Sequence, residues 1–246
     1  MPRYILLHET ASTNSYLSRI ASMLPSGTVI YTNSQTSGRG QRGNSWEAEP
    51  GKNLTFSMLV KHPAVVPSKQ FCISEAVSLA VVGWLSQYSD GFSVKWPNDI
   101  YYHDKKICGI LIEHVLCGNA IVHTIVGVGI NVNQEHFLSD APNPVSLIHV
   151  IGHEIPLEQA LHDVCERIEA ALDFSKADDA AFAALHDRYV KSLYRNDGHL
   201  HGFELPSGER FRAVIAGVGE SGMLRLRHEG GAIHEYAFKE VAYLVK

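Results

Sequence analysis

The chain has 246 residues, of which 45% are apolar and 19% are charged, and its formal net charge at pH 7 is −5. This composition excludes a wholly disordered chain, and the length allows one large folded domain, alone or with a small one. The negative charge counts against a nucleic-acid-binding protein, and no apolar run reaches the roughly 18 residues of a membrane span or follows the pattern of a signal peptide.

Strands and helices are predicted in turn along the first part of the chain. A helix is expected at 12–24, where Ser12 or Thr13 can serve as N-cap, and another at about 67–88, where apolar residues recur at helical spacing after Pro67. Further helical patterns cover about 157–173 and 179–194. Strands are predicted at 3–9, 27–33, 53–61 and 92–96, and two long β runs, 107–116 and 120–133, are joined by a hairpin at Cys117-Gly118-Asn119.

The pattern of predicted elements changes after Asn196. Five short β segments follow, separated by Pro206-Ser207-Gly208, by 219–222 and by Gly230-Gly231, which is typical of a small β-barrel. We therefore predict two domains, 1–194 and 195–246. The long antiparallel hairpin favours an α+β fold for the first, with a mixed or antiparallel sheet packed against helices.

The four cysteines, Cys72, Cys108, Cys117 and Cys165, are scattered and form no CxxC pair. Such spacing favours reduced thiols in a cytoplasmic protein, where most of them serve as small apolar core residues.

A cationic glycine-rich stretch, "TSGRGQRGNSW" at 36–46, lies between two predicted strands. Glycines let backbone N–H groups approach an anion, Arg39 and Arg42 supply fixed charge, and Trp46 could stack on a planar ring. The spacing matches neither GxGxxG nor the P-loop, and a plain surface turn or an RNA-contacting segment stays an alternative. We expect an anion or nucleotide loop.

Two other stretches contain candidate catalytic or ligand-binding residues. In "KWPND", Lys95 lies in an apolar strand, where a partly desolvated ammonium would attract a phosphate strongly; the alternative is an edge-strand lysine that prevents sheet pairing. Asn98 and Asp99 could simply form a turn. In "GVGINVN", glycines interrupt a strong strand, which indicates a nearby ligand or a bulge, and Asn131 is either a hydrogen-bonding site residue or a strand-end turn residue.

Catalytic or metal-binding patterns of other classes are missing from the sequence. There are 14 histidines but no HExxH, and neither the pair His199 and His201 nor the pair His149 and His153 has an obvious third ligand. No GxSxG is present either. We predict no metal-ligating residues.

Together these stretches resemble the biotin protein ligase family. The matching pieces are "STN" at 12–14, "QTSGRGQRGNSW" at 35–46, "KWPNDIYYHDKKICGILIE" at 95–113 and "GVGIN" at 127–131, in the family's order. The resemblance implies a class II synthetase-like catalytic domain followed by a small SH3-like β-barrel. It implies a biotin–[acetyl-CoA-carboxylase] ligase that uses ATP and Mg²⁺ to form biotinyl-5′-AMP and biotinylates a lysine of a biotin carboxyl carrier protein or domain.

The resemblance also assigns roles to residues of this chain. Lys95 and Arg39 would be catalytic, with Lys95 bridging the biotin carboxylate and the α-phosphate of ATP. Biotin would be held by Ser12, Thr13, Asn14, Gln35, Arg39, Gly40, Gln41 and Lys95. ATP or the adenylate would be held by Arg42, Asn44, Trp46, Lys106 and Asn131, although Lys106 could equally lie in a solvated turn.

The sequence departs from the family in two places. Gln41 stands where the family usually has an arginine, so one cation is lost from the adenylate loop. Many relatives carry a DNA-binding helix-turn-helix before the catalytic domain, whereas here the first strand begins at residue 3, and we expect a monomer or homodimer that binds neither DNA nor membrane. The alternatives are a lipoate ligase and, from a different class, a nucleic-acid-binding module.

Overall fold

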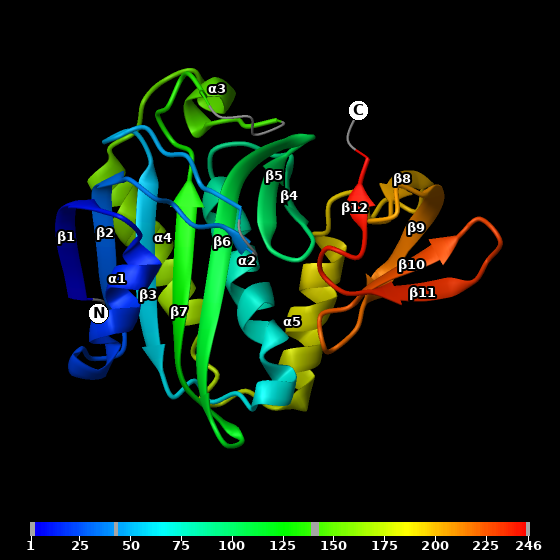
Figure 1. The fold of residues 1–246 in the computed structure, drawn as a ribbon, viewed down its shortest axis with the longest axis horizontal. Coiled ribbons are helices and arrows are strands. Elements are labelled where there is room, and N and C mark those ends of the chain that lie inside the picture. Colours follow the sequence, from blue (N-terminus) through cyan, green and yellow to red (C-terminus); the bar gives the residue numbers. More distant parts are fainter. Residues whose placement is uncertain (1–2, 42–43, 139–142, 245–246) are drawn as a thin grey trace.

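The computed structural model describes residues 3–41, 44–138 and 143–244, and Figure 1 shows two β-sheets side by side, with helices packed on the larger one. The larger sheet has seven strands in the order β1-β2-β3-β7-β6-β5-β4. β1 and β2 are parallel and all other neighbours are antiparallel. Its strands are β1 (Arg3–Thr10), β2 (Thr28–Gln35), β3 (Leu54–Lys61), β4 (Phe92–Lys95), β5 (Asp99–Tyr102), β6 (Lys105–Cys117) and β7 (Ala120–Ile130).

Two long helices cover one face of this sheet, a third packs beside them, and a short helix lies on the other face (Figure 1). The covering helices are α2 (Phe71–Leu85) and α4 (Leu157–Ala171), the third is α5 (Asp179–Lys191), which packs on α2, and the short one is α1 (Thr13–Ile20). α2 is apolar around most of its circumference, and its Val77, Val81 and Trp84 are fully buried between the sheet and its neighbours. The main core therefore lies behind the sheet, and the face that carries α1 remains available for a site.

The start of α1 follows from its sequence. The hydroxyl of Ser12 accepts a hydrogen bond from the backbone N–H of Ser15 at 3.4 Å, so Ser12 is the N-cap. Leu17 is buried in a small second core with residues of β2, β3 and β7, and the helix ends in a 3₁₀ turn, η1 (Ala21–Met23). The buried N-cap region consequently faces the sheet next to the end of β2.

The second sheet is formed by the C-terminal segment and is antiparallel throughout, in the order β11-β10-β9-β8-β12. The indole Nε1 of Trp96, between β4 and β5, donates to the carbonyl of Gly222 at 2.8 Å and so joins the two sheets. The strands are β8 (His201–Glu204), β9 (Arg210–Val218), β10 (Leu224–His228), β11 (Ile233–Tyr236) and β12 (Ala242–Tyr243).

The predicted α+β class is confirmed, and so is each predicted strand and long helix to within a few residues. Sequence reading missed β5, which has four residues and begins with Asp99, and α3 (Leu147–Ile151), because neither is long enough to show a period. A 3₁₀ turn, η3 (Pro67–Lys69), precedes α2 where one continuous helix was expected. The division at 194/195 stays a prediction.

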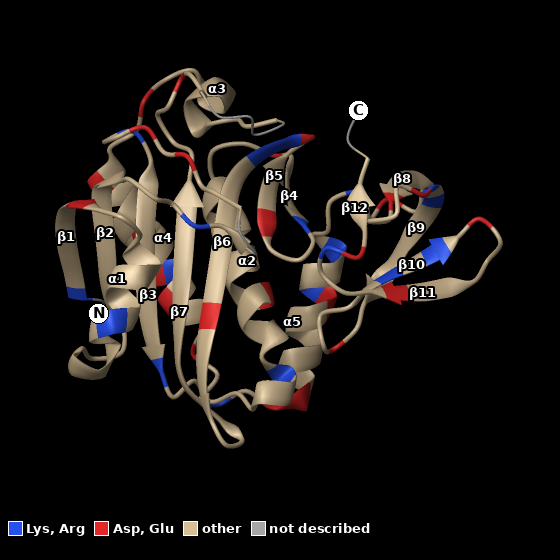
Figure 2. Ribbon diagram, in the orientation of Figure 1, with Lys and Arg blue, Asp and Glu red and all other residues tan. Residues whose placement is uncertain are grey.

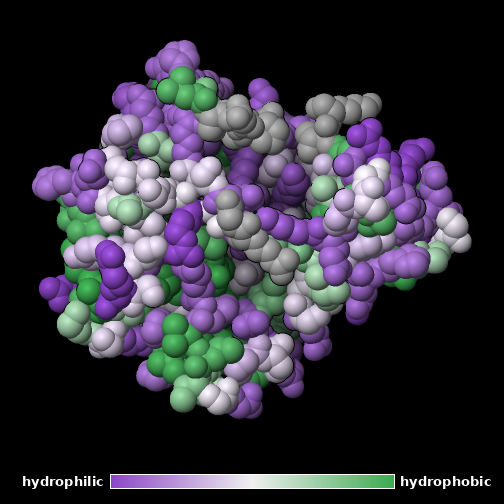
Figure 3. Space-filling model, in the orientation of Figure 1, coloured by the Kyte–Doolittle hydropathy of each residue, from purple (hydrophilic) through white to green (hydrophobic). Residues whose placement is uncertain are grey.

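The surface is mixed in charge and polarity. Figure 2 shows Lys, Arg, Asp and Glu interspersed over both sheets in this view. Figure 3 shows apolar surface gathered over the far end of the β6–β7 hairpin, where Val115 and Leu116 are 43% and 51% exposed. Within residues 3–41, 44–138 and 143–244, no helix is both long and apolar enough to cross a membrane.

Candidate functional site

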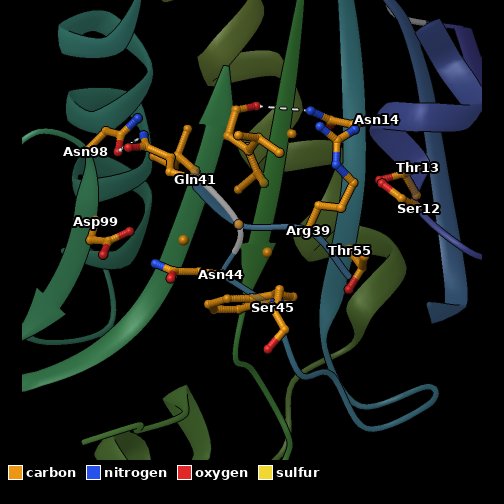
Figure 4. A pocket seen from close by; sticks show the side chains of 18 of the residues that line it. Ser12, Thr13, Asn14, Arg39, Gln41, Asn44, Ser45, Thr55, Asn98 and Asp99 are labelled. Atoms are coloured by element: carbon orange, nitrogen blue, oxygen red, sulfur yellow. Dashed lines mark hydrogen bonds between the residues drawn. The ribbon is translucent and has the colours of Figure 1, made fainter. Parts of the chain in front are cut away.

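A cavity lies on the face of the sheet that carries α1, beneath the loop that leaves β2. Figure 1 shows this loop passing in front of β3, β7 and β6, and Figure 4 shows the side chains that it and its neighbours direct into the cavity. The lining residues come from the start of α1, from this loop, from β3, β6 and β7, and from the β4–β5 turn; Phe238 is added from the C-terminal segment. The end at α1 is lined mainly by uncharged polar groups and holds one ion pair, Arg39–Glu113, and the other end holds the ion pair Lys106–Asp99.

The end at α1 is a hydrogen-bonded network. The N–H of Thr13 donates to Oε1 of Gln35 at 2.9 Å, and the buried hydroxyl of Ser57 donates to Oδ1 of Asn14 at 2.5 Å. The Thr13 hydroxyl lies 2.8 Å from that of Ser57. A Cβ on Gly127 would lie 2.1 Å from Asn14 Oδ1, so only glycine fits under this network. The arrangement presents fixed neutral donors and acceptors.

The charged end is built around Lys106 and Asp99. Nζ of Lys106 lies 2.6 Å from Oδ2 of Asp99, and both side chains are 32% exposed, so the ammonium remains reachable from the cavity. Nε2 of Gln41 donates to Oδ1 of Asn98 at 2.9 Å, which ties the glycine-rich loop to the β4–β5 turn (Figure 4). A partly enclosed ammonium at this position is suited to hold a carboxylate or a phosphate.

The indole of Trp46 lies on a flat floor made by two glycines. Gly109 on β6 and Gly129 on β7 are register partners, and a Cβ on either would meet the ring at 2.9 and 2.3 Å. The Lys106 ammonium lies 5.7 Å from the ring centroid. The buried Trp46 Nε1 has no hydrogen-bond partner within the described part of the chain. This corner can accept a planar group beside a cation.

Most predicted site residues line this cavity, and two of the described ones do not. Arg42 lies outside the described residues. Lys95 and Asn131 are not among the described residues that line the cavity. Those that line it are Ser12, Thr13, Asn14, Gln35, Arg39, Gly40, Gln41, Asn44, Trp46 and Lys106.

Lys95 points away from the cavity, toward the C-terminal sheet. Its Nζ donates to the Tyr101 hydroxyl at 2.8 Å and lies 4.6 and 5.4 Å from the ring centroids of Tyr101 and Tyr243. The expected placement of Lys95 in the cavity is therefore corrected. Lys95 and Asp99 are register partners and share a face of the sheet, but β4 is the edge strand, and the Lys95 side chain extends toward Tyr101 and Tyr243 instead of the cavity.

Burial has a measurable consequence for Lys95, because it lowers the pKa of the ammonium from 10.5 to about 8, against the opposing effect of Asp99. Between pH 8 and 10 the unfolded state therefore binds more protons at this residue than the native state. Lys95 therefore contributes a rise in the free energy of unfolding with pH in this window, of up to about 2 to 3 kcal/mol, whereas the buried thiols of Cys72 and Cys165, whose pKa is raised by burial, contribute a fall above about pH 9.

Chemical denaturation of wild type and Lys95→Met at pH 7.5 to 10 checks this expectation, with Lys105→Met, an exposed lysine on β6, as the control. The free energy of unfolding of wild type should increase with pH relative to that of Lys95→Met, whereas the difference between wild type and Lys105→Met should stay constant. Equal pH dependence in all three proteins would contradict it.

Asn131 has a structural position at the end of β7. It is 3% exposed, its Nδ2 donates to the carbonyl of Val145 at 3.0 Å, and its own N–H donates to the carbonyl of Ile107. Its buried Oδ1 has no partner among the described residues. Asn131 thus holds the segment after β7 beside β6, behind the charged end of the cavity.

Several residues of the site escaped the sequence analysis. Asp99 and Asn98 were interpreted as a turn, and Gly127 and Gly129 only as a general sign of a close ligand. Glu113 was not singled out, although it binds Arg39. The local sequence around Glu113 shows only a regular β-strand pattern. It could not indicate a site residue, since the partners Arg39 and Asn14 are 74 and 99 residues away in the chain. Among the described residues, no group of three or more His, Cys, Asp or Glu side chains is arranged to hold a metal ion.

Comparisons with known proteins agree with this geometry. Residues 6–131 match the model of the biotin/lipoate A/B protein ligase family. The bifunctional ligase/repressor BirA of Bacillus subtilis is 31% identical over 129 residues, which span 52% of this chain but only 37% of that protein. The biotin–[acetyl-CoA-carboxylase] ligase of Paracoccus denitrificans is 27% identical, and the match covers 92% of this chain and 95% of that one.

A solved structure is similar along the whole chain. The biotin protein ligase from Aquifex aeolicus in complex with biotin and ATP superposes with a TM-score of 0.81 at 26% identity, covering 100% of both chains. The likeness thus includes the C-terminal sheet as well as the residues that the family model matches.

Proposed function

Because the chain belongs to the biotin/lipoate A/B protein ligase family, we propose that it activates biotin with ATP to biotinyl-5′-AMP and transfers the biotinyl group to a lysine of a carrier protein. The observation that carries this proposal is the polarity of the cavity. A neutral hydrogen-bonding network, a lysine and an aromatic ring line a single cavity. Biotin has a neutral ureido ring and a carboxylate tail, and ATP adds phosphates and a planar base.

The ring of biotin is assigned to the network at α1. A ureido group is uncharged and has N–H donors and a carbonyl acceptor, so it needs fixed neutral partners. Ser12, Thr13, Asn14 and Gln35 supply them, and their own hydrogen bonds hold them in place before a ligand arrives. Asn14 is 3% exposed and acts mainly by fixing its neighbours.

The activating lysine is assigned to Lys106 instead of Lys95. Lys106 lines the cavity beside Trp46, and its ammonium is held by Asp99 at 2.6 Å. A carboxylate and an α-phosphate repel each other, and a cation between them lowers that repulsion and stabilises charge on the phosphate as the bond forms. Asp99 orients the ammonium. Arg39, paired with Glu113, belongs to the ring end of the site and not to the phosphate.

The proposed reaction has two steps. A carboxylate oxygen of biotin attacks the α-phosphorus of ATP, and the bond to the bridging oxygen of pyrophosphate breaks. The ε-amine of the acceptor lysine, in its neutral form, then attacks the biotinyl carbonyl carbon. AMP leaves with the electrons of the broken C–O bond, and the amine proton is released. The mixed anhydride must be kept from water between the steps, which the loop over the cavity would do.

Magnesium is proposed to enter with ATP as part of the substrate. Mg²⁺ prefers oxygen ligands and usually keeps several waters and phosphate oxygens, so few protein ligands are needed. Asn98, Asp99 and Asn44 line the charged end and offer oxygens near the expected phosphates.

The acceptor is proposed to be a biotin carboxyl carrier protein or domain of a carboxylase in the cytoplasm, where the free cysteines of this chain would stay reduced. The ligase would act as a monomer or homodimer. We propose no role for DNA, since the net charge is −5 and basic and acidic residues are interspersed (Figure 2).

The most direct test is biotin-dependent exchange of labelled pyrophosphate into ATP. Exchange that requires biotin and magnesium, followed by labelling of a carrier domain, is the expected result. Lipoate in place of biotin tests the alternative within the family. A dithiolane ring cannot form hydrogen bonds with the neutral donors at α1, so we expect little or no exchange of pyrophosphate with lipoate. Exchange with lipoate but not biotin would replace this proposal by the lipoate one.

Position 41 gives a prediction about retention of the adenylate. Gln41 donates a neutral hydrogen bond, at present to Asn98, whereas an arginine would bring charge to the phosphate. Charge-assisted bonds are about twice as strong as neutral ones. Gln41→Arg should therefore slow the release of biotinyl-AMP by about fivefold, and Gln41→Gly should speed it. Stopped-flow tryptophan fluorescence measures the release; identical rates in all three proteins would show that position 41 has no part in it.

A further inference from the structure

Glu113, in the middle of β6, connects two parts of the site that are distant in sequence. Its Oε1 lies 2.7 Å from Nη2 of Arg39, and its Oε2 accepts from Nδ2 of Asn14 at 2.9 Å. The same amide nitrogen of Asn14 also lies 3.2 Å from the carbonyl of Leu111 on β6. One carboxylate thus holds both the glycine-rich loop and the first turn of α1 (Figure 4 shows Arg39 and Asn14 side by side).

The Arg39 side chain has few other constraints. Gly38 and Gly40 flank it, and glycine leaves the backbone on either side with more freedom than any other residue. The loop closes on itself through Gly40 N–H to the Asn44 carbonyl at 2.7 Å and Trp46 N–H to the Gly38 carbonyl at 3.0 Å. These bonds are internal to the loop. The contacts of Arg39 with Glu113 and with the Ser15 hydroxyl, at 2.9 Å, link this part of the loop to β6 and α1 through side chains. The packing of Trp46 on Gly109 and Gly129 is an additional link between the loop and the sheet.

The ion pair also sets the charge of the ring end. Without Glu113, the Arg39 guanidinium would be an unpaired cation beside Asn14, at the end of the cavity that should receive an uncharged ring. A free cation there would attract the carboxylate of biotin or a phosphate of ATP and so favour ligands bound in the reverse direction. With Glu113 in place, the charge of Arg39 is balanced.

We propose that Glu113 is a positioning residue of the biotin site: by binding Arg39 and Asn14 at once, it holds the loop against α1 and keeps the ring end neutral. This inference rests on the proposed function. Glu113 touches neither substrate nor the reacting atoms in this assignment, and its effect should fall on biotin binding and adenylate retention instead of the chemical step.

The test is Glu113→Gln. Glutamine keeps the size and one acceptor oxygen for Asn14 but removes the charge and turns an N–H group toward the guanidinium. We expect the KM for biotin and the release rate of biotinyl-AMP each to rise by about three- to tenfold, with kcat for pyrophosphate exchange changed less than twofold. Glu113→Asp, which keeps the charge, should restore part of the loss.

Glu235→Gln is the matched control. It breaks the Arg225–Glu235 pair in the C-terminal sheet, which has the same 2.7 Å distance and is 48% exposed on both sides, against 47% and 37% for Arg39 and Glu113. Amide hydrogen exchange of the ligand-free proteins gives a readout that does not depend on activity. Exchange at Gly40 and Trp46 should be faster in Glu113→Gln than in wild type and unchanged in Glu235→Gln.

An unchanged biotin KM, release rate and loop exchange in Glu113→Gln would overturn the inference. A lower melting temperature and lower kcat with an unchanged KM would also overturn it, because that pattern belongs to a merely structural residue. If the wild-type protein shows no biotin-dependent pyrophosphate exchange, the proposed function fails, and the biotin-specific role of Glu113 fails with it. Loop exchange would then show separately whether Glu113 holds Arg39.

Discussion

Replacing Lys106 by alanine is expected to lower biotin-dependent pyrophosphate exchange at least about a hundredfold, because the variant loses a preorganised cation at the point where charge develops. The ammonium of Lys106 is fixed by Asp99 at 2.6 Å and lies beside the Trp46 ring, so water cannot easily replace it in the same position. The loss should appear mainly in kcat. Exchange of labelled pyrophosphate at saturating biotin and ATP measures it.

Two lysines close in sequence serve as controls. Lys105→Ala removes the exposed neighbour on the same strand, and Lys95→Met removes the lysine that faces the C-terminal sheet. Both should keep exchange within a few-fold of wild type, although Lys95→Met should change stability as described above. If folded Lys95→Met lost as much pyrophosphate exchange as Lys106→Ala, the activating lysine would be Lys95 instead of Lys106.

The second large effect is expected at two glycines of β7 that lie under different side chains of the site. A Cβ on Gly129 would lie 2.3 Å from the Trp46 indole, and one on Gly127 would lie 2.1 Å from Asn14. Gly129→Ala should therefore displace Trp46 and raise the KM for ATP about tenfold or more, since stacking of a base on an aromatic ring contributes about 1 to 3 kcal/mol. Gly127→Ala should instead disrupt the ring end and raise the KM for biotin.

The separation of the two effects is the critical result. Initial rates of exchange with biotin and ATP varied independently give both KM values for each variant. Gly83→Ala on α2, where a Cβ would meet nothing within 4 Å, should leave both KM values unchanged and can stabilise the helix by about 1 kcal/mol. If Gly127→Ala and Gly129→Ala raised the same KM, the proposed order of biotin and ATP along the cavity would be wrong.

The sequence by itself was sufficient for the fold class, the order of most strands and helices, and ten of the residues that line the cavity. The physical reason is that these features are encoded locally. Ser12 caps the helix that follows it, the apolar runs of β3, β6 and β7 are long enough to predict buried strands, and the glycine-rich loop brings Arg39, Gly40, Gln41, Asn44 and Trp46 to the site as one segment.

Only the tertiary structure decided which lysine faces the cavity. The register pairs Lys95–Asp99 and Tyr101–Lys106 put both lysines on the same face of the sheet, so the choice between them depends on their position across it. Lys95 lies on the edge strand β4 beside the C-terminal sheet, whereas Lys106 lies on β6, and the short strand β5 between them was not predicted.

The tertiary structure also decided the partners of the site residues. The Arg39–Glu113 pair, the Gly109–Gly129 floor under Trp46 and the contact of Asn14 with β6 each join residues about 20 to 100 positions apart. Such contacts arise from strand register and from the path of the loop across the sheet. These are properties of the folded chain, and no local pattern around Glu113 or Gly109 could have indicated them.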